Sequence, residues 1–298
     1  KRSALPARSE MCIRDRGNMA TLYLVGTPIG NLGDITFRAI ETLKQVDIIA
    51  CEDTRVTKKL CNHYDITTLL KSYHEHNKEQ QTDYLIQLLK EENNIALVSD
   101  AGLPLISDPG YELVVEAHKH NIAVETIPGP NAGLTALMAS GLPSFTYTFL
   151  GFLPRKEKEK VNILSQRMYQ DSTLIIYESP FRVIDTLKAI IKVDSKRRVA
   201  VGRELTKKFE QIVMLEVSQL LEAIENQEIP QKGEFVILIE GAKAQETKQW
   251  FEDVTIIDHV NHYIETQNLK PKKAIKVVAE ERQMKTSEIY DIYHNIKS

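Results

Sequence analysis

The chain has 298 residues, of which 42% are hydrophobic and 27% charged, and its formal net charge at pH 7 is −3. This composition is typical of a globular protein with enough apolar side chains for two or three hydrophobic cores. No segment approaches the roughly 18 consecutive apolar residues of a membrane-spanning helix, so we expect no membrane association. The small negative charge argues against a surface covered in basic residues, so any RNA site must be local.

The cysteines and the first 18 residues indicate where in the cell the protein is expected to work. Cys12, Cys51 and Cys61 are an odd number at irregular spacings, which favours neither a disulfide framework nor a zinc module. We therefore expect a reducing, cytoplasmic location and no bound metal. Residues 1–18 are basic and polar and lack an apolar core segment. They are expected to form a leader outside the folded protein, with a weak organellar targeting peptide as the alternative.

From Met19 onward, short β-branched segments alternate with longer amphipathic segments. The segments predicted as strands are residues 21–25, 47–50, 95–99 and 122–127, with helices between them. This alternation predicts an α/β domain with a largely parallel sheet, which we place at residues 19–143.

A second α/β series is predicted at residues 144–243. Its expected strands are residues 147–150, 173–177, 198–201, 211–215 and 235–240, and its expected helices are residues 158–170, 181–191 and 218–226. Residues 196–198, with the sequence Lys-Arg-Arg, are expected to be a solvated charge run.

After Gly241 the strand pattern stops, and helices are expected near residues 255–266, 271–283 and 287–296. We assign residues 244–298 to a small helical domain. Its lysines around Pro271 leave two interpretations open, a helix-turn-helix that touches nucleic acid and a helical lid or oligomer contact.

Three irregular loops follow predicted strands. Residues 25–33 read VGTPIGNLG, residues 99–110 read SDAGLPLISDPG and residues 127–132 read IPGPNA. Loops at the carboxyl ends of parallel strands are where α/β proteins bind ligands, so we expect all three at the same end of the sheet. A structural loop capped by Asp100 and Asp108 is the alternative for the second. Glu52 and Asp53 lie about 20 residues after the first loop, where a dinucleotide-binding protein has the acid that binds the ribose. A Rossmann dehydrogenase is therefore an alternative on this motif alone.

These loops occur with four further motifs, CEDTR at 51–55, GFLPR at 151–155, ESPFR at 178–182 and GRELTKKFE at 202–210. In this order the motifs resemble the tetrapyrrole (corrin/porphyrin) methylase family, and within it the branch of 16S ribosomal RNA cytidine 2′-O-methyltransferases. The motif at 202–210 separates that branch from enzymes that act on small macrocycles.

The resemblance implies a class III methyltransferase with two α/β domains around a cofactor cleft and a small C-terminal helical domain. It also implies a homodimer that methylates a cytidine, position 1402 in standard numbering, of 16S ribosomal RNA or the small ribosomal subunit. The implied contacts of S-adenosylmethionine are Pro28, Asp100, Ala101, Gly102, Leu105, Ile106, Asn131, Ala132, Tyr177, Glu178 and Arg203.

Basic residues within the motifs are expected to contact RNA phosphates, which supply affinity and position. They are Arg55, Arg155, Lys156, Arg182, Lys207 and Lys208. Phe152, Phe181 and Phe209 flank these cations, where they either stack on an extruded base or belong to the core.

Transfer to a 2′-hydroxyl requires a base that shares its proton. The candidates are Glu52, Asp53, Asp100 and Glu204, of which we select Asp53 and Glu204 as catalytic residues, with helix capping or cofactor orientation as the alternative for each. A methylase of small macrocycles and a non-catalytic nucleotide-binding or RNA-binding module are the alternative functions.

Overall fold

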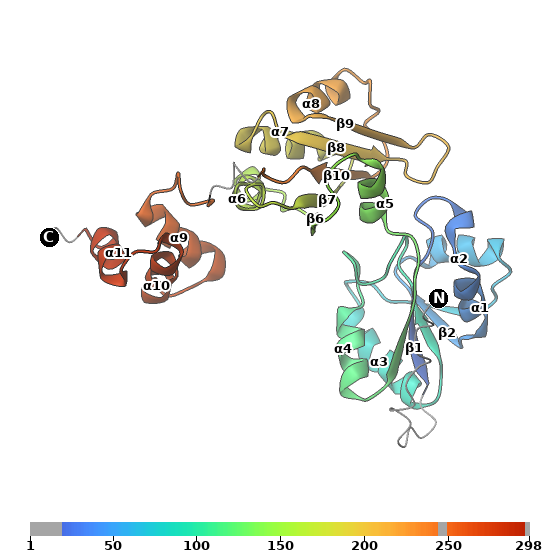
Figure 1. The fold of residues 1–298 in the computed structure, drawn as a ribbon. Coiled ribbons are helices and arrows are strands. Elements are labelled where there is room, and N and C mark those ends of the chain that lie inside the picture. The colour runs from blue at the N-terminus through green and yellow to red at the C-terminus, as the bar shows by residue number, and fades with distance from the viewer. Residues whose placement is uncertain (1–19, 244–248, 296–298) are drawn as a thin grey trace, which may run out of the picture. The chain divides into compact units, whose positions relative to one another are not determined.

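The computed structural model describes residues 20–243 and 249–295 (Figure 1). The leader expected at residues 1–18 lies outside the described residues, as does the end of the last predicted helix. The chain divides into two compact units. The first contains the described residues up to Ser140 together with Val201–Val213 and Gly233–Val236, and the second contains the remainder. The domain boundaries at residues 143 and 243 stay predictions.

The first unit is built on a five-stranded parallel sheet with the order β3-β2-β4-β1-β5. Its strands are β1 (Thr21–Val25), β2 (Ile48–Cys51), β3 (Leu69–Ser72), β4 (Ile95–Leu97) and β5 (Ala123–Ile127). The helices are α1 (Phe37–Gln45), α2 (Thr54–His63), α3 (Lys78–Lys90), α4 (Tyr111–Lys119) and α5 (Ala132–Ala139), and η2 (Leu32–Asp34) is a short 3-10 turn. Every residue of β2 and β4 is buried, as expected for central strands covered by helices on both faces.

Two hydrophobic clusters pack against this sheet. One gathers Leu22 with Leu85 and Leu113, and the other gathers Ile49 with Leu43 and Leu60. The alternation of side chains along each strand divides the apolar residues between these clusters, so the sheet is held rigidly below the loops at its carboxyl edge.

The second sheet has the order β6-β7-β10-β8-β9. Its strands are β6 (Tyr147–Phe152), β7 (Thr173–Glu178), β8 (Arg198–Arg203), β9 (Gln211–Glu216) and β10 (Phe235–Ile239), and its helices are α6 (Glu157–Arg167), α7 (Val183–Val193) and α8 (Val217–Glu225). β10, in the middle of the sheet, is wholly buried, whereas β6 at one edge is largely exposed.

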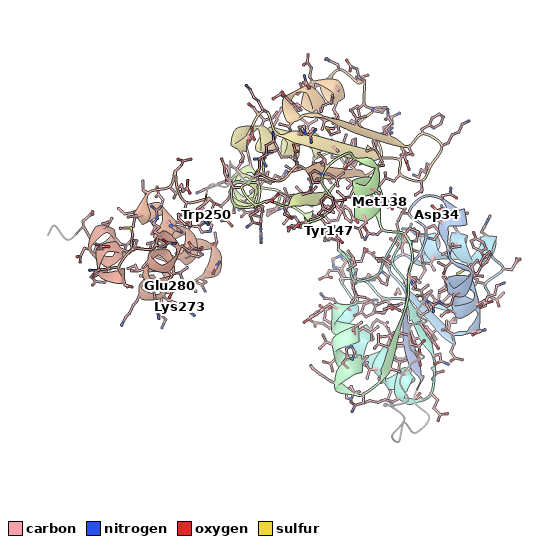
Figure 2. The ribbon with its side chains drawn as sticks, viewed as in Figure 1. Asp34, Met138, Tyr147, Trp250, Lys273 and Glu280 are labelled. Atoms are coloured by element: carbon pink, nitrogen blue, oxygen red, sulfur yellow. The ribbon has the colours of Figure 1, made fainter. Side chains whose placement is uncertain are left out.

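The C-terminal helices are α9 (Ile256–Gln267), α10 (Pro271–Arg282) and α11 (Thr286–Tyr293), which pack around Val260, Ile275 and Ile289. Trp250, labelled in Figure 2, precedes these helices. Its ring contacts the ring of His259 at 4.8 Å between centroids. Lys273 lies on the exposed side of α10. No helix in the described part of the chain is long and apolar enough to cross a bilayer.

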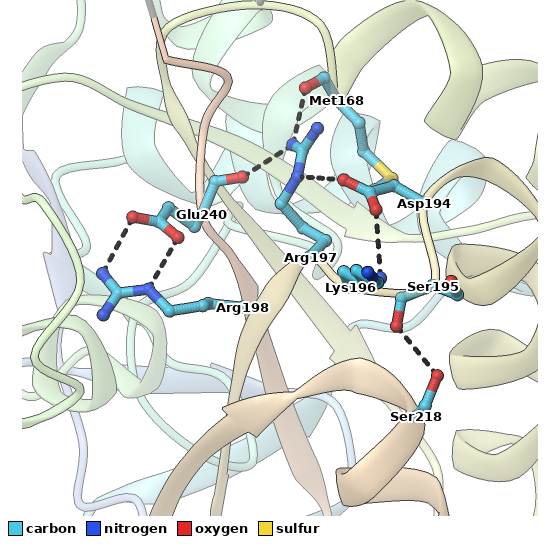
Figure 3. Close-up of polar contacts among 8 residues, drawn as sticks. All are labelled: Met168, Asp194, Ser195, Lys196, Arg197, Arg198, Ser218 and Glu240. Carbon is cyan, nitrogen blue, oxygen red and sulfur yellow. Dashed lines mark hydrogen bonds and ion pairs between the residues drawn. The ribbon is translucent and has the colours of Figure 1, made fainter.

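The α/β fold class and the C-terminal helices are confirmed, whereas the expectation of a solvated charge run at residues 196–198 is wrong for Arg197. Its side chain is only 6% exposed, and it donates to the carbonyl oxygens of Met168 (2.7 Å) and Glu240 (2.9 Å) (Figure 3). It also pairs with Asp194 at 3.0 Å, while Arg198 forms two 2.8 Å hydrogen bonds to the Glu240 carboxylate. Arg197 therefore joins the end of α6 to the end of β10.

Candidate active site

The three loops predicted to bind a ligand meet at the carboxyl edge of the first sheet. The Thr27 N–H donates to the Gly102 carbonyl (2.9 Å), and the Gly102 N–H donates back to the Thr27 carbonyl (3.1 Å). The Gly26 N–H donates to the carbonyl of Ile127 at 3.0 Å. The loops after β1, β4 and β5 are therefore joined backbone to backbone, as the strand assignments predicted.

Glycine is required where the first and third loops touch. A Cβ added to Gly26 would lie 2.7 Å from the Cα of Gly129, and one added to Gly129 would lie 2.8 Å from the Cα of Gly26. Gly102 has a φ of +79°, which side chains other than glycine rarely adopt. These glycines let the three loops pack backbone against backbone, and we call the joined loops the cradle.

The loop after β4 holds two further residues in the left-handed region. Leu105 has a φ of 71° and Ser107 a φ of 59°. Such conformations cost roughly 1–3 kcal/mol each and gather at binding and catalytic sites. Leu105 also packs against the hydrophobic cluster of Leu22, whereas its neighbour Ile106 is exposed. The strained loop is therefore held to the core by the side chain of Leu105, and the side chain of Ile106 is exposed to solvent.

Asp53 and Asp100 connect the end of β2 to the loop after β4. The Asp100 carboxylate accepts a hydrogen bond from the Asp53 N–H at 3.0 Å. The Asp53 carboxylate accepts from the backbone N–H of Arg55 (2.9 Å), as the N-cap of α2, and from the Arg55 side chain (2.9 and 3.1 Å). These hydrogen bonds lower the pKa of Asp53, with the guanidinium first among the causes. Its carboxylate is thus a weak base that is engaged in capping.

Asp108 and Glu52 form the most perturbed pair of acids in this unit. Burial raises the pKa of Asp108 to about 7, and the negative charges of Glu52, Asp100 and Glu234 add to the rise. Burial also raises the pKa of Glu52, as does the charge of Asp100, and the two carboxyl groups are hydrogen-bonded to each other. Each carboxyl group thus makes ionisation of the other less favourable. In the sequence, Asp108 was named only in the alternative of a structural loop, although a second acid in a Gly- and Pro-rich loop after a buried strand is a signal for a site.

The connection between β8 and β9 lies against the first loop. The Asn31 side chain donates to the Thr206 carbonyl at 3.2 Å, and a Cβ on Gly30 would lie 3.0 Å from the Leu205 carbonyl oxygen. Glu204 pairs with Lys207 at 3.5 Å. Thr206 is β-branched yet has a φ of 69°, and its hydroxyl is buried without a hydrogen-bond partner among the described residues. The motif at 202–210 therefore packs against the loop at residues 25–33.

The tetrapyrrole (corrin/porphyrin) methylase model matches residues 21–221, which is more than half of the chain. The chain belongs to this family. Proteins named ribosomal RNA small subunit methyltransferase I from Halalkalibacterium halodurans and Bacillus subtilis are 50% and 47% identical to this methylase. The matches cover 96% of the chain and 99% and 98% of the relatives.

Solved structures resemble the fold of this methylase. A cobalt precorrin-4 methyltransferase matches with a TM-score of 0.57 at 19% identity, over 76% of this chain and 98% of its own. A diphthine synthase matches with a TM-score of 0.59 at 14% identity, over 78% of this chain and 95% of its own. At these identities, the similarity shows a shared fold.

The methylase uses S-adenosylmethionine, and the cradle in the first unit fits that group. The carboxylate of Asp100 lies on these joined loops, and a carboxylate can accept hydrogen bonds from an ammonium group or from ribose hydroxyls. Residues expected there lie on the three loops, namely Pro28, Asp100, Ala101, Gly102, Leu105, Ile106, Asn131 and Ala132. Asn131 is engaged as the N-cap of α5, where its side chain accepts from the Leu134 N–H at 2.8 Å.

The remaining expected cofactor contacts lie on the second sheet. Glu178 is buried and accepts hydrogen bonds from the Ser179 N–H (2.9 Å) and the Thr186 hydroxyl (2.7 Å), so it fixes the start of α7. Arg203 is buried and donates to the Gln211 side chain at 2.7 Å. Tyr177 is half-buried, between the rings of Phe149 and Phe152. All three side chains thus have partners within the protein, and their part in cofactor binding stays a prediction.

The residues expected to contact RNA fall in three places. Arg55 lies at the start of α2, Lys207 and Lys208 lie between β8 and β9, and Arg155, Lys156 and Arg182 follow β6 and β7. Within residues 20–243 and 249–295, no group of three His, Cys, Asp or Glu side chains is placed to hold a metal ion.

Proposed function

We propose that this methylase transfers the methyl group of S-adenosylmethionine to the 2′-hydroxyl of a cytidine in 16S ribosomal RNA, at position 1402 in standard numbering. The observation that carries the proposal is the similarity, at 50% identity over nearly the whole of both chains, to a protein named ribosomal RNA small subunit methyltransferase I. The nucleotide and the ribose oxygen come from the resemblance of the motifs, above all that at residues 202–210.

Bound S-adenosylmethionine supplies an activated methyl group, and the protein must hold the acceptor oxygen in line with it. The joined loops of the first unit are suited to this positioning because glycine contacts and backbone hydrogen bonds fix their spacing. A rigid cradle lowers the entropic cost of aligning the two reactants.

A base near the acceptor is needed because a ribose hydroxyl is a poor nucleophile. Asp53 and Glu204 are the proposed candidates from the sequence. The capping contacts of Asp53 favour an orienting role for it, while Glu204 pairs with Lys207 at 3.5 Å and adopts a φ of 51°. The hydrogen-bonded acids Glu52 and Asp108 are a third candidate, since a carboxyl with a pKa near 7 accepts a proton more readily than an ordinary one.

We further propose that the partner is 16S ribosomal RNA or the small ribosomal subunit, that the protein acts as a homodimer, and that it works in the cytoplasm. The exposed cations of the motif loops support contact with phosphates. Sedimentation of the purified protein tests the dimer, which a monomeric mass at micromolar concentration would contradict.

The function is tested with methyl-tritiated S-adenosylmethionine and three acceptors. These are small subunits reconstituted from unmodified transcript, the naked 16S transcript and a porphyrin precursor. We expect label in one or both ribosomal RNA samples and none in the macrocycle. Label in the macrocycle alone would show a small-molecule methylase, and no label anywhere would favour a binding module.

A further inference from the structure

The edge strand β6 carries aromatic side chains that the core does not use. Tyr147 (Figure 2), Phe149 and Phe152 are exposed, and the Phe149 and Phe152 rings contact Tyr177 of β7 at 5.1 and 6.0 Å between centroids. Tyr177 is the only residue of β7 that is not buried. Large apolar side chains are normally covered in a single chain, so this exposed face indicates a binding surface.

A bulge places two of these rings on the same face. Pairing with β7 is regular up to Phe149, which lies opposite Ile175, and resumes at Gly151 opposite Ile176, with Phe152 opposite Tyr177. In an uninterrupted strand, residues three apart point to opposite faces. The extra residue turns Phe152 to the face of Phe149, which agrees with both rings contacting Tyr177. Bulges that redirect a side chain in this way are common beside functional sites.

The loops after β6 and β7 repeat one pattern. Each carries an exposed phenylalanine and at least one cation, with Phe152 preceding Arg155 and Lys156, and Phe181 preceding Arg182. Because β6 and β7 are neighbouring parallel strands, both loops lie at the same edge of the sheet. Phe181 is 88% exposed and Phe152 is 55% exposed.

The cations of this edge are available to a ligand. In the described part of the chain, the side chains of Arg155, Lys156 and Arg182 form no ion pair or hydrogen bond, unlike those of Arg197 and Arg198. Exposed aromatic rings beside unpaired cations fit a ligand that alternates flat bases with phosphates.

Acidic residues of the same segments do not cancel this charge entirely. Glu157 is paired with Lys192 at 2.8 Å, and Glu178 is buried with its hydrogen bonds satisfied. Glu159 and Asp185 follow within the first turns of α6 and α7. The loops themselves, ahead of these helices, present only positive charge.

We propose that this edge, which we call the stacking platform, binds unpaired nucleotides of RNA. The platform consists of Phe149, Phe152, Phe181, Arg155, Lys156 and Arg182. Its rings need free base faces, which a duplex hides, so the ligand is single-stranded RNA. The inference rests on the proposed function and deepens it, because it identifies the acceptor as a nucleotide in an unpaired segment.

The test measures binding of a fluorescent single-stranded RNA of about 12 nucleotides by anisotropy. Replacing both rings, as Phe152→Leu with Phe181→Leu, keeps apolar bulk and removes the stacking faces. We expect roughly tenfold or greater loss of affinity, with the dependence of affinity on salt unchanged. Phe145→Leu is the matched control, because Phe145 is 98% exposed at the amino end of β6, away from both loops, and we expect no loss.

Charge is tested separately with Arg155→Gln and Arg182→Gln. Each substitution is expected to lower the slope of log affinity against log salt by about 0.7, because each phosphate contact with a single strand releases that share of a counterion. Lys188→Gln, on the exposed side of α7, is the control and should leave the slope unchanged.

Three results would overturn the inference. These are wild-type affinity in the double phenylalanine variant, equal affinity of the wild type for duplex RNA of the same sequence, and a parallel loss of S-adenosylmethionine affinity in calorimetry, which would assign the rings to the cofactor. Methyl transfer to ribosomal RNA by the wild type is measured alongside. If that transfer is absent, the proposed function fails, while the anisotropy still decides whether the platform binds single strands.

Discussion

Replacing Asp108 with asparagine should stabilise the protein at neutral pH. The carboxyl is half-buried, hydrogen-bonded to Glu52 and close to the charges of Asp100 and Glu234. Its pKa in the folded protein is about 7, against an ordinary value of 3.8. The folded state therefore holds the proton more tightly than the unfolded state, and the ionised form destabilises the fold.

The sign and the pH window follow from these two values. Well below pH 3.8 both states are protonated and Asp108 costs nothing. The unfolding free energy then falls as pH rises toward 7 and levels off above it. A rise from 3.8 to about 7 corresponds to about 4 kcal/mol at ~1.4 kcal/mol per pH unit. Solvent screens a half-buried group, so we expect roughly 1–2 kcal/mol.

The measurement is urea unfolding followed by circular dichroism at several values between about pH 5 and about pH 8. The informative quantity is the difference between Asp108→Asn and the wild type, because other groups, such as the histidines, titrate in both. This difference should grow in favour of the variant across the window. Asp83→Asn, at an exposed position on α3, is the control and should follow the wild type. If Asp108→Asn is less stable at every pH, the carboxylate is a stabilising loop cap and its burial does not destabilise the fold.

Three further substitutions test the cradle, the buried arginine and the candidate base. Gly129→Ala places a Cβ 2.8 Å from the opposing loop backbone, so it should abolish S-adenosylmethionine binding in calorimetry. Gly33→Ala is the control and should retain binding, because its Cβ meets only a side-chain oxygen at 3.2 Å. Equal affinities of the two variants would contradict a role of the cradle in cofactor binding. Arg197→Met leaves buried acceptors unpaired and should cost about 3–5 kcal/mol in thermal unfolding, against about 1 kcal/mol or less for the exposed Arg198→Met. Similar losses of unfolding free energy in the two variants would show that the burial of Arg197 does not increase its contribution to stability. Glu204→Gln should lower kcat by roughly 10²-fold or more at unchanged cofactor affinity, and full activity would remove Glu204 as a candidate base.

Local patterns in the sequence predicted most of the elements. The strand expected at residues 21–25 is β1, and the helix expected near residues 271–283 is α10, because hydrophobic periodicity and the first-turn proline act within a few residues. β3 was not predicted. It is a short edge strand, LLKS, whose first leucine is exposed, so it lacks the apolar run that marks a buried strand.

Properties that depend on distant residues could not be read from the sequence. The raised pKa of Asp108 comes from burial and from acids at positions 52, 100 and 234, which only the fold brings together. Arg197 looked like part of a charge run because its partners at Met168 and Glu240 are far along the chain. The meeting of the three loops at one edge of the sheet was predictable, since each loop follows a recognisable strand of a parallel sheet.

The proposed function depends on the acceptor atom, which is identified by analysing the modified nucleoside. Unmodified 16S ribosomal RNA, free and in reconstituted subunits, is treated with the protein and S-adenosylmethionine, digested to nucleosides and analysed by mass spectrometry. We expect 2′-O-methylcytidine at one position, with a fragment that shows the added mass on the ribose. A methyl group on a base, on another nucleoside or on no ribosomal RNA would contradict it.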